Sequence, residues 1–244
     1  MLENQFVLVY LCLIIALQSS IGVGVLVLGT PFLLLLEYNI LQVFFILLPL
    51  SMLTSLINLI IMGLPNKKLN VATHKGLTKF FVVCIPSIIA GLFILKYFQD
   101  YINFKFLVSV VIIFSILLVL FKDKIKFRVN FFRISILSIV GIIHGLTNSG
   151  GTLMSLALSS NNEKNNARYS ITFFYLVLAT FQYLTTIMIF QKSFFFPQNI
   201  YLVMVLFFGV LFGNLFVKFL SESKYKLAVN SLALISSIIL LVNI

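Results

Sequence analysis

The stretch Gln18-Ser19-Ser20-Ile21-Gly22-Val23-Gly24 breaks an apolar run that extends over residues 5–36. A second stretch, His144-Gly145-Leu146-Thr147-Asn148-Ser149-Gly150-Gly151-Thr152, breaks another apolar run over residues 131–160. Small polar residues at mid-membrane depth are tolerated where the helix is interrupted and lines a cavity. Paired interruptions at matching places in two halves of a chain predict the substrate site of a secondary transporter.

The composition sets the class of protein. Hydrophobic residues make up 61% of the chain and charged residues 9%, whereas a soluble domain has roughly 25% charged residues. An all-α polytopic membrane protein is therefore expected, embedded in a lipid bilayer. Further apolar runs, each close to the roughly 20 residues that cross a bilayer, lie near residues 39–63, 80–98, 104–121, 169–190, 198–217 and 226–243.

The net charge of +11 comes from Lys and Arg residues that flank the apolar segments. They form no continuous basic face, so nucleic acid is not an expected partner. If both broken segments are re-entrant hairpins that enter and leave on one side, that topology leaves only Lys96, Lys105 and Lys192 away from the basic side. Because basic loops face the cytoplasm, hairpins with both chain termini outside are favoured over eight full crossings. A long kinked crossing helix is the alternative.

An internal repeat is visible in the second part of each half. The segment Gly91-Leu92-Phe93-Ile94-Leu95-Lys96-Tyr97-Phe98 can be aligned with Gly213-Asn214-Leu215-Phe216-Val217-Lys218-Phe219-Leu220. Each half then contains one broken helix pair and three crossings, and an odd number of crossings inverts the second half. The sequence therefore predicts two inverted transmembrane repeats, 1–122 and 123–244, an architecture common among secondary transporters.

The two breaks together suit an anion. If each hairpin starts its second half-helix near Gly24 or Gly151, two helix N-termini point at a common spot, and such ends carry unpaired amides and partial positive charge. Small residues that only permit tight helix packing are the alternative explanation. The predicted substrate-binding residues are Gln18, Ser19, Ser20, Gly22, Gly24, His144, Thr147, Asn148, Ser149, Gly150, Gly151 and Thr152.

Other polar residues narrow the ligand class. The six acidic residues fall in loops or at segment ends, which argues against a cation substrate and against a carboxylate proton relay. His144 is compatible with a ligand donor, a proton carrier or a neutral histidine bonded to a backbone carbonyl. Asn58 and Gln182 can reach the centre, with interhelical hydrogen bonding expected for each. No metal-ligand spacing and no nucleotide or cofactor motif is present, so no metal or cofactor is expected.

The pattern as a whole resembles the sulfite exporter TauE/SafE family of bacterial anion transporters. The resemblance is carried by the first break followed by Pro31, by Gly141, Gly145 and Ser149-Gly150-Gly151 in the second, and by Lys164 and Arg168 before the next helix. It is also carried by Gly209-Val210-Leu211-Phe212-Gly213, Leu220-Ser221 and Tyr225-Lys226. The family implies movement of small sulfur anions, such as sulfite or sulfonates, coupled to the proton gradient or membrane potential.

These features predict an alternating-access transporter of a small anion in the bacterial inner membrane, with its basic loops in the cytoplasm and no enzymatic activity. An anion channel of the same fold is the nearest alternative. An intramembrane hydrolase with Ser149 as nucleophile and His144 as base is a further alternative, which lacks a third orienting residue.

Overall fold

The computed structural model describes residues 5–63, 74–120, 133–161, 163–191 and 200–221, with scattered residues from 223 to 242. Within these ranges every regular element is helical. The elements are α1 (Gln5–Ile21), α2 (Val25–Leu35), α3 (Ile40–Gly63), α4 (His74–Lys79), η1 (Phe80–Cys84), α5 (Ile85–Phe98), α6 (Phe104–Leu120), α7 (Ile134–Thr147), α8 (Gly150–Asn161), α9 (Lys164–Phe190), α10 (Ile200–Phe216) and η2 (Val217–Phe219).

Four of the described helical segments are long and apolar enough to cross a membrane: Ile40–Gly63, Gly76–Phe98, Lys164–Phe190 and Ile200–Phe219. They match four of the six predicted crossings, and the all-α membrane class is confirmed. The predicted crossing at 104–121 corresponds to α6, whose 17 residues reach about 26 Å at 1.5 Å per residue. The predicted crossing at 226–243 lies largely outside the described residues.

Both broken segments are pairs of short helices. Helices α1 and α2 contain 17 and 11 residues, and α7 and α8 contain 14 and 12. At 1.5 Å per residue these lengths run from about 17 to about 26 Å, less than the roughly 30 Å of bilayer hydrocarbon. None of the four helices is therefore long enough to cross comfortably by itself.

Helices α1 and α2 form an antiparallel hairpin. The Tyr10 hydroxyl donates a hydrogen bond to the Leu28 carbonyl at 3.1 Å, and the Tyr10 ring stacks on Phe32 with centroids 3.6 Å apart. Phe6 lies against the same Phe32 ring. Contacts that pair earlier residues of α1 with later residues of α2 are those of a helical hairpin, and they exclude one long kinked helix here.

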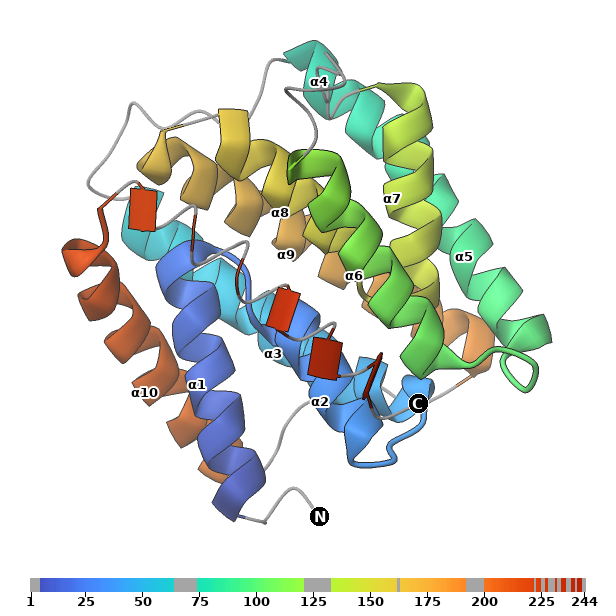
Figure 1. The fold of residues 1–244 in the computed structure, drawn as a ribbon, viewed down its shortest axis with the longest axis horizontal. Coiled ribbons are helices and arrows are strands. Elements are labelled where there is room, and N and C mark those ends of the chain that lie inside the picture. The colour runs from blue at the N-terminus through green and yellow to red at the C-terminus, as the bar shows by residue number, and fades with distance from the viewer. Residues whose placement is uncertain are drawn as a thin grey trace.

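The long helices α3 and α9 lie between two flanking pairs, α1 with α10 and α5 with α7 (Figure 1). Each flanking pair is closed by glycine. A Cβ at Gly213 of α10 would lie 2.3 Å from the Ala16 carbonyl oxygen of α1, and one at Gly91 of α5 would lie 2.3 Å from the Ile142 oxygen of α7. Small residues allow membrane helices to approach closely and gain van der Waals contact.

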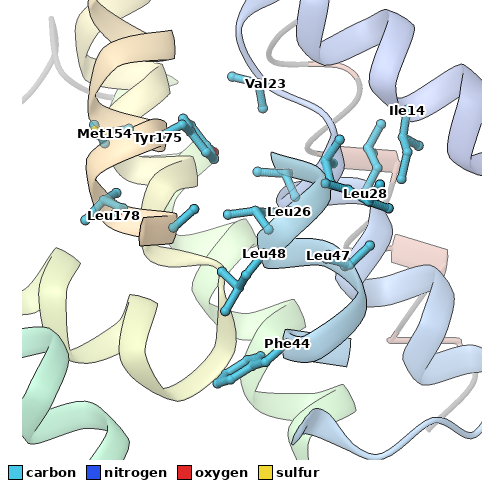
Figure 2. Close-up of a cluster of buried hydrophobic side chains, with 14 of the residues drawn as sticks. Ile14, Val23, Leu26, Leu28, Phe44, Leu47, Leu48, Met154, Tyr175 and Leu178 are labelled. Atoms are coloured by element: carbon cyan, nitrogen blue, oxygen red, sulfur yellow. The ribbon is translucent and has the colours of Figure 1, made fainter. Parts of the chain in front are cut away.

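Helix α2 fills the space between α1 and α3. Figure 2 shows Leu26 and Leu28 of α2 in one cluster with Ile14 of α1 and with Leu47 and Leu48 of α3, and these side chains are buried. Helix α10, by contrast, has an apolar face that is exposed, on which Phe207 is 63% exposed. In a membrane protein such an exposed apolar face contacts the lipid of the bilayer. The buried contacts of α2 instead hold the first hairpin in place inside the protein.

Residues 74–98 form one helix with a π-helical turn, η1, before Pro86. Proline has no amide hydrogen and its ring crowds the preceding turn. A π-helical turn accommodates an additional residue in the helix. The helix therefore passes Pro86 without ending.

Candidate functional site

The first break consists of residues 22–24, between α1 and α2. Gly22 has a φ of +84°, a conformation that residues with a side chain rarely adopt. A Cβ there would also meet the Ile171 side chain of α9 at 3.0 Å. At Gly24 a Cβ would lie 2.4 Å from the Ile14 carbonyl oxygen. Both predicted glycines are thus required for the tight turn of the hairpin.

Gln18 uses its side chain within the protein. Its Nε2 donates to the Ser51 carbonyl and the Ser55 hydroxyl of α3, each at 3.1 Å. Its Oε1 accepts a hydrogen bond from the Val25 amide, the first residue of α2, at 3.1 Å. In this conformation the amide at the start of α2 is therefore already satisfied by the chain itself.

Ser19 belongs to a polar network that joins four helices. Asn58 of α3 donates to the Ser19 hydroxyl at 2.9 Å, and Asn214 of α10 donates to the Asn58 side-chain oxygen at 2.7 Å. Arg168 of α9 donates to the Ser19 carbonyl and to the Asn214 side-chain oxygen. The interhelical role expected for Asn58 is confirmed. Ser20 donates to the Leu17 carbonyl of its own helix.

Arg168 is only 6% exposed, although the sequence placed it in a loop before the next crossing. Its guanidinium group lies at the C-terminal end of α1, where carbonyl groups without helical partners carry partial negative charge. Arg168 and Asn214 are polar interior residues that sequence reasoning did not select. The polar Asn214 within an apolar run was the available signal.

The second break is formed by Asn148 and Ser149, between α7 and α8. Asn148 has a left-handed backbone and its amide donates to the His144 carbonyl. The Thr147 hydroxyl accepts from the Ser149 amide at 3.2 Å, and the Ser149 hydroxyl donates to the Thr147 carbonyl at 3.2 Å. The turn is therefore closed by its own short polar residues, whose side chains often bond to nearby backbone groups.

Gly150 and Gly151 allow the start of α8 to press against its neighbours. A Cβ at Gly150 would lie 2.1 Å from the Val140 carbonyl oxygen of α7. One at Gly151 would lie 2.6 Å from the Tyr175 hydroxyl oxygen of α9. The two glycines therefore bring the N-terminal turn of α8 directly onto a polar group of α9.

Five polar side chains around the second break are at most 1% exposed and carry side-chain atoms without a hydrogen bond of standard geometry to any described residue. We call them the second-break cluster: His144, Asn148, Thr152, Tyr175 and Gln182. The unpaired atoms are both ring nitrogens of His144, the hydroxyls of Thr152 and Tyr175, and the amide oxygens of Asn148 and Gln182. Buried polar groups are nearly always hydrogen-bonded, so this cluster is suited to a polar ligand or to water.

Gln182 has a defined orientation within the cluster. Its Nε2 donates to the His144 carbonyl at 2.9 Å, which leaves its oxygen as the available acceptor. This confirms the predicted interhelical bond, and the free oxygen shows that the residue has capacity for a second partner. Tyr175 lies two helical turns before Gln182 on the same helix, next to Ser155 of α8. An aromatic residue in a crossing helix gives no sequence signal of such a position.

The two hairpins touch where the Asn148 amide group approaches the Thr30 hydroxyl of α2 at 3.4 Å. The first break itself lies against Ile171 and the Arg168 carbonyl of α9, whereas the second lies against Tyr175 of the same helix. From Ile171 to Tyr175 is about 6 Å along a helix. The two breaks thus lie about one helical turn apart along α9. At the contact between the hairpins, the residue of a break that meets the opposite hairpin is Asn148, and not Gly22 or Gly24.

The geometry for a Ser–His nucleophile is not formed in this conformation. The Ser149 hydroxyl bonds to the Thr147 carbonyl, and neither ring nitrogen of His144 bonds to it. Among the described residues, no three His, Cys, Asp or Glu side chains gather in a way that could hold a metal ion.

Residues 7–240 match the family model described as "Sulfite exporter TauE/SafE". The match spans nearly the whole chain and includes both breaks. No curated protein and no solved structure matches the chain.

Proposed function

Because the chain belongs to the sulfite exporter TauE/SafE family, a family of membrane transporters, we propose that it moves a small sulfur oxyanion or sulfonate across the bacterial inner membrane by alternating access. The observation that carries the proposed site is the second-break cluster. It provides unpaired buried hydrogen-bonding groups at a break in the fold. Broken helices near the midplane are where secondary transporters bind their substrates.

The chemistry of the second-break cluster suits an oxyanion. The hydroxyls of Thr152 and Tyr175 and one ring nitrogen of His144 can each donate a hydrogen bond to a ligand oxygen. The N-terminal turn of α8, which begins at Gly150, adds the partial positive charge of a helix end. Neutral donors and a helix dipole bind an anion less tightly than a buried positive charge would. This suits a transporter, because it must also release its substrate.

The first break is proposed to contribute in another conformation of the transport cycle. Gln18, Ser19 and Ser20 are engaged with the protein here, and the α2 amide of Val25 is occupied by Gln18. If the first hairpin moves, exchange of the Gln18 oxygen for a substrate oxygen would leave that amide satisfied. Such an exchange would cost little, because one hydrogen bond replaces another.

Equivalent contacts support the two inverted repeats. Gln18 and Ser19, just before the first break, bond to Ser51 and Asn58 of α3. Gly151 and the His144 carbonyl, on either side of the second break, contact Tyr175 and Gln182 of α9. Both pairs are seven residues apart on the first long helix of their half. Each hairpin also packs against a helix of the opposite half, α1 on α10 and α7 on α5. Movement of one half would therefore displace the hairpin of the other.

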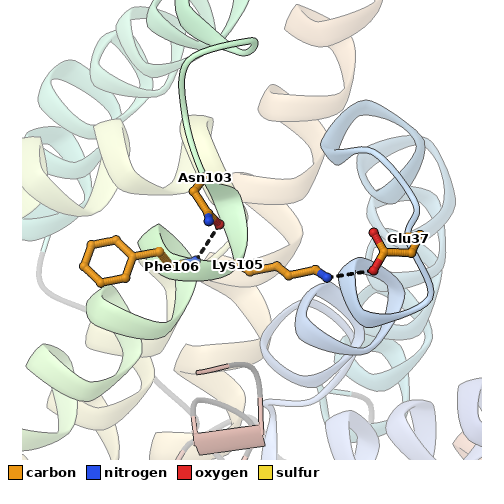
Figure 3. Close-up of polar contacts among 4 residues, drawn as sticks. All are labelled: Glu37, Asn103, Lys105 and Phe106. Carbon is orange, nitrogen blue, oxygen red and sulfur yellow. Dashed lines mark hydrogen bonds and ion pairs between the residues drawn. The ribbon is translucent and has the colours of Figure 1, made fainter. Parts of the chain in front are cut away.

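The ends of the helices support the proposed orientation. Lys164 donates to the Leu220 carbonyl at 2.6 Å, which groups two of the basic segments assigned to the cytoplasm. Glu37 and Lys105 form an ion pair between the segment after α2 and the start of α6, at 2.7 Å (Figure 3). These two segments belong to the side proposed to be external.

The test is uptake of radiolabelled sulfite, thiosulfate and sulfoacetate into proteoliposomes that contain the purified chain. Thr152→Val removes an unpaired hydroxyl of the cluster. Thr185→Val is its matched control, because the Thr185 hydroxyl makes an exposed hydrogen bond to the Phe181 carbonyl of its own helix. We expect saturable uptake of one of these anions that falls about tenfold or more in Thr152→Val, since one hydrogen bond to a charged group contributes about 1.5–3 kcal/mol. Thr185→Val should transport normally.

Two results would contradict the proposal. Absence of uptake for every sulfur anion would reject the substrate class, and equal uptake by the two threonine variants would reject the site. Counterflow distinguishes a carrier from a channel, because only a carrier speeds labelled uptake when unlabelled substrate is inside. Non-saturable flux without counterflow would favour the anion channel.

A further inference from the structure

A cavity of about 370 Å³ lies between the C-terminal end of α3, the start of α9 and the end of α10. We call it the α10 cavity. Its polar lining consists of Arg168, Asn214 and Lys218, and the rest of its lining is apolar. Its volume lies within the range of roughly 300–1,000 Å³ that is typical of pockets for small ligands. It is separate from the second-break cluster, with which it shares no residue.

The charge of the α10 cavity is positive. Arg168 and Lys218 are its ionisable lining residues, and no carboxylate is among the described residues that line it. The Arg168 guanidinium is held in place by the Ser19 carbonyl and the Asn214 side chain, whereas Lys218 is exposed. Lys164 lies near the rim, because it donates to the carbonyl of the lining residue Val217 at 3.3 Å. A fixed guanidinium beside an exposed lysine is suited to a phosphate group.

The apolar side of the α10 cavity faces lipid. Ile61 of α3 and Leu211 and Leu215 of α10 line it and are 42%, 44% and 46% exposed. Exposed apolar side chains on crossing helices contact the hydrocarbon of the bilayer. A ligand that fits both sides has an anionic head and an apolar chain that runs along the helices.

We propose that the α10 cavity binds an anionic phospholipid of the cytoplasmic leaflet. The phosphate lies against Arg168 and Lys218, and an acyl chain runs along Ile61, Leu211 and Leu215. Basic pockets between membrane helices on the cytoplasmic side bind such headgroups, because they combine positive charge with adjoining hydrocarbon. The guanidinium that contacts the phosphate also holds the Ser19 carbonyl, so the bound lipid lies one side chain away from the end of α1, next to the first break.

The test compares phosphatidylglycerol with phosphatidylcholine of the same acyl chains, added to the full chain in detergent. Binding is measured by native mass spectrometry and by the shift in unfolding temperature. We expect phosphatidylglycerol to bind and raise the unfolding temperature, and phosphatidylcholine to do neither. Lys218→Gln should weaken phosphatidylglycerol binding about fivefold, which corresponds to about 1 kcal/mol for a basic residue near anionic lipid.

Matched variants test whether the lipid binds in the α10 cavity. Ile61→Trp fills the cavity and should abolish lipid binding, whereas Ile60→Trp on the same helix should not, because Ile60 is 53% exposed and lies outside the lining. Lys224→Gln, at an exposed position outside the lining, is the control for Lys218→Gln. If Ile61→Trp does not fold, the exposed Lys218 variant still decides the question.

Three outcomes would overturn the proposal. They are equal binding of the two lipids, unchanged phosphatidylglycerol binding in Lys218→Gln, and stabilisation by soluble glycerol phosphate or sulfite to the same extent as by the lipid. The last result would identify the cavity as an aqueous anion vestibule. None of these outcomes depends on transport activity, so they leave the proposed function to be judged separately.

Discussion

The side-chain oxygen of Gln18 accepts a hydrogen bond from the Val25 amide at 3.1 Å, across the turn of the first hairpin. The same side chain donates to Ser51 and Ser55 of α3. One glutamine thus caps α2, closes the hairpin and ties it to a crossing helix. Its loss would leave several buried groups without partners.

Gln18→Ala is expected to lower the free energy of unfolding by about 1–3 kcal/mol, the cost of leaving buried hydrogen-bonding groups unsatisfied. Thermal or denaturant unfolding in detergent measures this change. Gln42→Ala is the control, because Gln42 also accepts from a backbone amide, that of Asn39, but at an exposed site. It should cost only about 0.5 kcal/mol. Equal effects would show that Gln18 does not hold the hairpin.

The glycines of the two flanking helix pairs should be intolerant of any side chain. Gly213→Ala and Gly91→Ala each place a Cβ 2.3 Å from a carbonyl oxygen of the facing helix. Separation of the helices is then expected to cost about 1–3 kcal/mol or more in stability. Gly63→Ala is the control, since its nearest neighbour is the Tyr169 hydroxyl at 4.0 Å. The fraction of monodisperse protein after heating would show the difference, and a stable Gly213→Ala protein would argue against this packing.

Tyr175→Phe should separate binding from folding. The Tyr175 hydroxyl lies in the second-break cluster without a standard hydrogen bond to a described residue, so its removal should leave the unfolding temperature nearly unchanged. If the hydroxyl donates to substrate, the half-saturating concentration for transport should rise about tenfold, which corresponds to about 1.4 kcal/mol. Tyr97→Phe, at a site 70% exposed, is the control. A stability loss without a transport effect would assign Tyr175 to the core.

The orientation of the chain can be measured by labelling single cysteines with a membrane-impermeant thiol reagent. Gln99→Cys, in the segment after α5, should react in intact cells, and Lys218→Cys should react only after the membrane is opened, because basic segments face the cytoplasm. The native Cys12 and Cys84 lie within helices and are half-buried and buried, so the parent chain gives the background. The reverse labelling pattern would invert the topology.

The two helix breaks could be predicted because their cause is local. Glycine and short polar residues interrupt an apolar run wherever it occurs, and the structure places turns at Gly22 and Asn148 within the predicted stretches. Four of the predicted crossings followed from segment length in the same way. The inverted relationship of the halves remains a prediction that the paired contacts support.

The partners of the polar residues could not be predicted, because they are set by distant contacts. Gln18 bonds to Ser51, 33 residues away, and nothing near Gln18 in sequence indicates that choice. Arg168 was counted as a loop cation for topology, yet its side chain reaches inward to Ser19, 149 residues earlier. Tyr175 belongs to the cluster only because Gly151 brings α8 against it.

The packing of α1 on α10 also determines when the protein can finish folding during its synthesis. Gly213 packs against Ala16 of α1, and it leaves the ribosome only after most of the chain has been made. Until then the first hairpin enters the bilayer without one of its principal neighbours. Contacts between residues so distant in sequence form late, and incomplete chains are exposed to mispairing. A nascent chain that stops before residue 200 therefore leaves the first hairpin as a target for membrane quality control.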